Sequence, residues 1–174
     1  MVVNANILVI IEIKLPLLIR CVSPDDIPQR LFLDTNIYII GIANQDSYER
    51  KILESVGFLQ SSSVEVIVSE ELLNQTLRVS KRLYNKDWGS QIVARIWQQL
   101  QVIYVNFTSE EWLKIEELGL IPREDIGVYL TASKGETQCF VSANYKLIRC
   151  LVQETKEFEC LTPQEFVNKY LSRL

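Results

Sequence analysis

The sequence has no histidine among its 174 residues, and this absence removes several kinds of active site. Histidine is the commonest general base near neutral pH and the commonest zinc ligand. Histidine-dependent catalytic triads and the usual zinc hydrolase centres are therefore excluded. The four cysteines form no CxxC pair, which argues against a zinc ribbon or a thioredoxin-like redox site. This pattern favours reduced, structural cysteines and a cytoplasmic location.

Long uninterrupted apolar runs are also lacking. Residues 7–19 are mostly apolar, but Glu12, Lys14 and Pro16 interrupt them, so the run is too broken to span a membrane. It is also a poor signal peptide, because no basic segment precedes it and no small-residue cleavage site closes it. We expect no membrane association and interpret residues 1–30 as an N-terminal extension, either an extra strand or an ill-ordered segment.

The sequence lacks an excess of positive charge. Its net charge is −4, with 23% charged and 48% apolar residues. Because the protein as a whole does not attract nucleic acid, any such binding would need a local basic patch. The length and composition are ordinary for one globular domain with a sizeable core, which we place at residues 31–174.

Apolar and β-branched runs alternate with segments of helical spacing. This alternation predicts βαβ units and therefore an α/β fold, with a mainly parallel sheet of about four to five strands flanked by helices. The predicted strands are residues 31–33, 64–68, 102–105 and 139–142, and the predicted helices are residues 35–43, 47–60, 70–83, 88–100, 108–118, 125–134, 144–150 and 162–171.

Polar side chains follow the predicted strands at the points where these end. Asp34 follows the first strand, Glu70 and Glu71 follow the second, and Asn144 follows the fourth. Asp125 begins a helix. Ligands of open α/β sheets bind beyond the carboxyl ends of the strands, and grouped carboxylates need a cation to offset their repulsion. Because Mg²⁺ and Mn²⁺ prefer oxygen ligands, the sequence predicts a site for one of these ions.

Four stretches in this order resemble the PIN-domain family, which includes toxin ribonucleases of toxin–antitoxin pairs. They are residues 31–36 (Leu-Phe-Leu-Asp-Thr-Asn), 66–75, 122–132 and 139–147. The resemblance implies a three-layer PIN-like domain with ribonuclease activity, a divalent cation as cofactor and an antitoxin as partner. A homo-oligomer is left open.

The resemblance assigns a role to each of four residues. Asp34 and Asp125 match family acids and would bind the metal, with Asp125 as a second ligand or as the residue that holds a water. Gln75 and Asn144 stand where the family usually has acids, and would orient the water or the phosphate. Amide oxygens can coordinate a cation but add no negative charge, so the metal should be weakly held. Glu71, one helical turn before Gln75, is a candidate substitute.

Two functions remain open at this point. The first is a divalent-metal-dependent ribonuclease whose activity is weakened because two of four expected acids are amides. The alternative is a catalytically inactive PIN-fold module that binds RNA or another protein, which the same two amides support. A cysteine hydrolase is a distant third, since no histidine is present to activate a thiol.

Each candidate residue also has a purely structural interpretation. Asp34 could cap the following helix, and Asp125 could be a first-turn acid stabilised by the helix dipole. Glu70 and Glu71 are more typical of first-turn acids than of ligands. A basic cluster follows Gln75, and it could either contact RNA phosphates or form an ordinary solvated helix face. The cluster consists of Arg78, Lys81 and Arg82, which are the candidate RNA contacts, with Lys86 and Arg95 further along the chain.

Overall fold

The computed structural model describes residues 27–172. The predicted N-terminal extension therefore lies outside the described residues, except for residues 27–30. Ile27 packs at the edge of the core and Pro28 is buried, while Arg30 already begins the first strand. Within the described part of the chain, no helix is long and apolar enough to cross a membrane.

The domain is built on one sheet of five strands, and all four strand pairings are parallel. The prediction of an α/β fold with a mainly parallel sheet is confirmed. The strand missing from the sequence prediction is the fifth, whose three residues are only half buried. In spatial order the strands are β3 (Gln101–Val105), β2 (Glu65–Ser69), β1 (Arg30–Leu33), β4 (Cys139–Val141) and β5 (Glu159–Leu161).

β1 lies at the centre of the sheet, and this position explains why a short apolar run was enough to predict the strand. Leu31, Phe32 and Leu33 are all buried, as is typical of a parallel strand covered on both faces. Phe32 packs against Phe140 of β4, with the ring centroids 5.2 Å apart. This pairing holds the carboxyl ends of β1 and β4 side by side.

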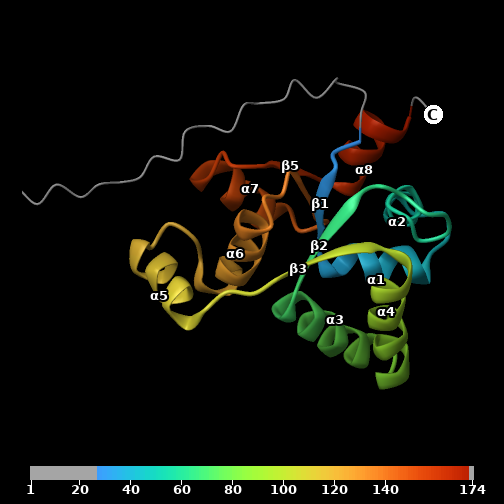
Figure 1. Ribbon diagram of the computed structural model, residues 1–174, viewed down its shortest axis with the longest axis horizontal. Helices are drawn as coiled ribbons and strands as arrows, with labels where there is room; N and C mark the ends of the chain where they lie inside the picture. Colours follow the sequence, from blue (N-terminus) through green and yellow to red (C-terminus); the bar gives the residue numbers. More distant parts are fainter. Residues whose placement is uncertain (1–26, 173–174) are drawn as a thin grey trace, which may run out of the picture.

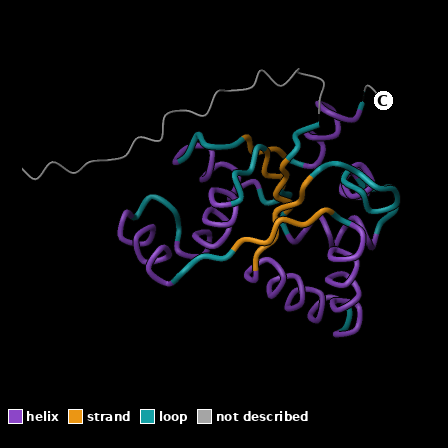
Figure 2. Tube along the Cα trace, in the orientation of Figure 1, coloured by secondary structure: helices purple, strands orange, loops and turns teal. Residues whose placement is uncertain are grey.

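Helices cover both faces of the sheet and complete the three layers. Figure 1 shows α1 and α2 on one side of the strands and α6 and α7 on the other, and Figure 2 shows the strands enclosed between these two groups. The helices are α1 (Thr35–Ala43), α2 (Tyr48–Ser55), α3 (Glu70–Leu83), α4 (Lys86–Gln99), α5 (Ser109–Leu118), α6 (Ile126–Lys134), α7 (Tyr145–Glu154) and α8 (Pro163–Phe166), with a 3₁₀ turn η1 (Arg123–Asp125) and a π-helical turn η2 (Val167–Leu171).

Capping residues decide where several of these helices begin and end. The predicted capping boxes at Thr108 and Thr162 are both present. The helix predicted at residues 47–60 was too long, because the chain turns at Gly57, whose φ of 116° is readily adopted only by glycine. The helix predicted at residues 88–100 was too short at its start, because the side chain of Asn85 caps α4 and the helix begins at Lys86.

Candidate functional site

Asp34 is the first residue after the central strand, and the residue is only 7% exposed. One carboxylate oxygen accepts a hydrogen bond from the Thr35 backbone N–H at 2.7 Å, so Asp34 does cap α1. The other oxygen accepts from the Asn36 side-chain amide at 2.6 Å and from the Ser142 hydroxyl. Three donors therefore fix the position of this buried carboxylate.

The charge of Asp34 has no cation to offset it in the described residues, since none of their ion pairs includes it. Burial raises the pKa of the Asp34 carboxyl above its usual value, and the hydrogen bonds from Ser142, Thr35 and Asn36 lower it in part. The carboxylate form is thus disfavoured by its surroundings. A bound cation would relieve that cost.

Ser142 links the end of β4 to the end of β1. Its oxygen accepts hydrogen bonds from the Asn144 backbone N–H at 2.9 Å and from Asn36 Nδ2 at 3.2 Å. Asn36 Oδ1 in turn accepts from the Ala143 backbone N–H at 3.0 Å. Sequence reasoning did not single out Ser142, because a serine after a strand has no distinctive local pattern.

Gln75 reaches this region from α3. Its side-chain oxygen accepts a hydrogen bond from the Thr35 hydroxyl at 3.0 Å, and Thr35 is the residue next to Asp34. The hydroxyls of Thr35 and Thr76 lie 3.5 Å apart. Thr35 therefore links the two candidate residues, because its hydroxyl donates to Gln75 and its backbone N–H donates to Asp34.

Asn144 lies at the same end of the sheet, and its side chain caps a helix. Its side-chain oxygen accepts from the Leu147 backbone N–H at 3.3 Å, which caps α7. Its backbone N–H joins the Ser142 hydrogen bonds next to Asp34. No capping role for Asn144 was predicted from the sequence, so this contact is found only in the structure.

Asp125 ends η1 and precedes α6 without making a capping hydrogen bond. Partial burial raises the pKa of the Asp125 carboxyl most, and the charges of Glu124 and Asp34 raise it further, while Lys146 opposes them. The charge of Asp34 thus acts on Asp125 across the end of the sheet. A cation between such carboxylates would stabilise both.

Glu71 lies next to α6, the helix that Asp125 precedes. A Cβ atom placed on Gly127 would lie 3.1 Å from Glu71 Cγ and 3.1 Å from Trp112 Cζ3, so Glu71 lies at the contact of α3 with α6. It is not among the groups that shift the pKa of Asp125. These contacts place Glu71 beside Gly127, two residues after Asp125, so it stays a candidate acid near that residue.

The oxygen ligands around Asp34 suit Mg²⁺ or Mn²⁺ in kind but supply little charge. Residues 27–172 contain no group of three or more carboxylate, thiol or imidazole side chains arranged to hold a metal ion. Two carboxylates, Asp34 and Asp125, are accompanied by neutral amide and hydroxyl oxygens. Oxygen atoms of these kinds are the ligands that a hard cation prefers, although only two of the groups carry charge.

Comparison with known proteins identifies the architecture. No protein-family model and no curated protein matches the chain. The solved structure of VapBC2 from Rickettsia felis, bound to a DNA fragment from their promoter, matches with a TM-score of 0.51 and 15% identity, covering 76% of this chain and 98% of that one. The structure of VapBC-1 from nontypeable Haemophilus influenzae matches with a TM-score of 0.52 and 13% identity, covering 78% and 98%.

This chain has a PIN-like fold. The two likenesses confirm the architecture that the four sequence stretches predict. At such low identity they establish the fold alone, so the functions of individual residues depend on the geometry described above.

The basic cluster divides into two parts. Arg78, Lys81 and Arg82 are exposed on α3, and no ion pair found in residues 27–172 includes them. Arg95 instead lies over the ring of Phe58, 6.0 Å from its centroid. The spacing of the three α3 residues puts them on neighbouring positions of one helix surface, and Lys81 and Arg82 also suit the negative end of the helix dipole.

Proposed function

We propose that this protein is a divalent-metal-dependent ribonuclease of the PIN type, with activity weakened by the amides at Gln75 and Asn144. The observation that carries the proposal is Asp34. It is a buried carboxylate at the end of the central strand, held by three donors and, within the described residues, paired with no cation. Such an arrangement is costly for stability and is typical of sites where charge serves chemistry.

In this proposal Asp34 and Asp125 would hold Mg²⁺ or Mn²⁺. Such an ion neutralises charge on a phosphodiester and lowers the pKa of water. Asn36 and Ser142 fix the carboxylate of Asp34 in one orientation. Gln75, positioned by Thr35, would orient the water or the phosphate, and so would Asn144.

Asp125 is the residue proposed to hold the attacking water and accept its proton. Its carboxyl is half-buried and makes no capping hydrogen bond, so it is available to a water. Attack in line with the departing ribose 3′ oxygen would leave a 5′-phosphate on one product and a 3′-hydroxyl on the other. Arg78, Lys81 and Arg82 would contact phosphates further along the strand.

The partner and location follow from the same interpretation. The matched structures are of VapBC assemblies, which supports an antitoxin as the partner of this chain. A cytoplasmic location agrees with the free, buried thiol of Cys139.

A second function has its own observation in favour. This function is a catalytically inactive module that binds RNA. The side-chain oxygen of Asn144 caps α7 and is therefore not free for a metal or a water, as an inactive module would allow. Incubating the purified protein with mixed RNA in Mn²⁺ and in EDTA separates the two. The nuclease produces fragments only with Mn²⁺, whereas intact RNA that still binds would establish the inactive module.

A further inference from the structure

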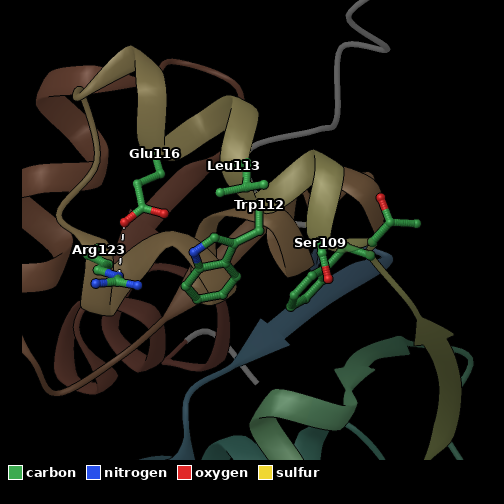
Figure 3. Close-up of a pocket in the computed structure, with 7 residues that line it drawn as sticks. Ser109, Trp112, Leu113, Glu116 and Arg123 are labelled. Carbon is green, nitrogen blue, oxygen red and sulfur yellow. Dashed lines mark ion pairs between the residues drawn. The ribbon is translucent and has the colours of Figure 1, made fainter.

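A pocket of about 320 Å³ opens between α5 and η1, the turn that ends at Asp125. Figure 3 shows the indole of Trp112 at its centre, with Ser109 at one end and Arg123 at the other. The volume is at the lower end of the roughly 300–1,000 Å³ that small-molecule pockets occupy. The pocket therefore has room for one small organic group. Its lining includes Phe107, Ser109, Trp112, Leu113, Glu116 and Arg123.

The lining combines aromatic walls with a polar rim. The rings of Phe107 and Trp112 are 6.0 Å apart between centroids, and both side chains are half buried. Glu116 and Arg123 form an ion pair at 2.9 Å, which offsets the carboxylate charge inside the pocket. A flat ring could stack on Trp112 while its polar edge reaches Ser109, Glu116 or Arg123.

The pocket adjoins the proposed acids through two short segments. Arg123 and Asp125 are the two ends of the same 3₁₀ turn. Trp112 also packs against Gly127 in the first turn of α6, where a Cβ atom would be 3.1 Å from its ring. A ligand on Trp112 would therefore lie beside Asp125.

We propose that this pocket binds one base of a single-stranded RNA substrate by stacking on Trp112, an inference that rests on the proposed ribonuclease function. A base is flat and uncharged, so the acidic residues of α5 do not repel it as they would repel a phosphate. The backbone of the same nucleotide would extend towards Asp125. Base stacking on aromatic side chains is a common way to hold single-stranded RNA.

The test measures RNA binding in EDTA, so that it does not depend on cleavage. Fluorescence anisotropy compares labelled oligoadenylate, oligouridylate and oligocytidylate with an abasic ribose-phosphate chain of the same length. Trp112→Ala should weaken binding of the base-bearing chains about tenfold, as expected for loss of one stacked base, and leave binding of the abasic chain unchanged. Trp112→Phe should retain most of the affinity.

Two further variants control for folding and for aromatic loss in general. Trp97→Ala removes a half-exposed tryptophan that packs against Tyr104 and does not line the pocket, and it should bind like the wild type. Ser109→Trp fills the pocket from an exposed position and should mimic Trp112→Ala. If Trp112→Ala does not fold, Ser109→Trp still decides the matter.

The outcomes separate this inference from the proposed function. Unchanged affinity in the folded pocket variants, with Mn²⁺-dependent cleavage intact, would overturn the base pocket and leave the ribonuclease standing. Equal losses on abasic and base-bearing chains would also overturn it. Base-dependent binding without any cleavage would support the pocket and overturn the ribonuclease, and a wild-type protein that neither binds nor cleaves RNA would overturn both.

Discussion

Restoring the two missing acids should strengthen metal binding without disturbing the fold. In the double variant Gln75→Glu and Asn144→Asp, each new carboxylate keeps an oxygen where the amide oxygen now accepts a hydrogen bond. Those bonds come from the Thr35 hydroxyl at 3.0 Å and from the Leu147 N–H at 3.3 Å. Aspartate is as good a helix cap as asparagine, so α7 should remain capped.

The size of the effect follows from the added charge. Two unit charges about 4 Å apart attract by about 1 kcal/mol in water and about 4 kcal/mol near a protein surface, and a divalent ion doubles this. Repulsion among four carboxylates and loss of hydration remove most of that gain. We expect about 1.4 kcal/mol per restored acid, which is about tenfold in Mn²⁺ affinity for each and about a hundredfold for both.

Isothermal titration with Mn²⁺ measures this directly. A matched control carries the same two chemical changes at exposed positions on α4 and η2, Gln98→Glu with Asn168→Asp. The control should bind Mn²⁺ like the wild type, because its added charges lie away from Asp34. Equal affinities for the restored and control variants would refute the assignment of Gln75 and Asn144 to the metal site.

Three further predictions follow. Replacing Arg78, Lys81 and Arg82 by Ala should weaken binding to all RNAs and leave the melting temperature unchanged. The slope of log affinity against log salt concentration should become shallower by up to about two. Equal slopes for variant and wild type would show that the cluster is an ordinary surface. Ser142→Ala should lower the free energy of unfolding, measured in urea, by about 1–3 kcal/mol, because the Asn144 N–H loses its acceptor. An unchanged urea midpoint of unfolding would contradict the role of Ser142 as the link between β1 and β4. Burial raises the pKa of Asp34 in the folded protein above 3.8. In the absence of metal, the free energy of unfolding should therefore fall as the pH rises from 3.8 through that higher pKa. The loss is about 1.4 kcal/mol for each pH unit by which the folded-state pKa exceeds the unfolded-state pKa. Asp34→Asn should lack this decline, and parallel pH profiles of the two melting temperatures would contradict it.

The fold could be predicted because parallel strands leave a strong signal. Residues 31–33 and 139–141 are continuous apolar runs, and burial on both faces requires them. β5 escaped detection because an edge strand of three half-buried residues needs no such run. The end of α2 depends on the backbone of Gly57, which apolar spacing does not report.

The candidate site could be predicted only in part. The positions of Asp34 and Asp125 are indicated by the chain, because one follows a strand and the other opens a helix. Two of the donors to Asp34, Thr35 and Asn36, are its neighbours in the chain, but the third, Ser142, is 108 positions away, and only the strand register brings it to Asp34. The pocket at Trp112 likewise depends on how α5 meets η1.

One measurement tests the central claim most directly: cleavage of an end-labelled RNA by the wild type and by Asp34→Ala, with the product ends identified. We predict fragments with 5′-phosphate and 3′-hydroxyl ends, formed by the wild type with Mn²⁺ but not with EDTA, and none from Asp34→Ala. RNA that stays intact with the wild type in Mn²⁺, or cleavage that persists in Asp34→Ala, would contradict the assignment of this chain as a ribonuclease that acts through Asp34.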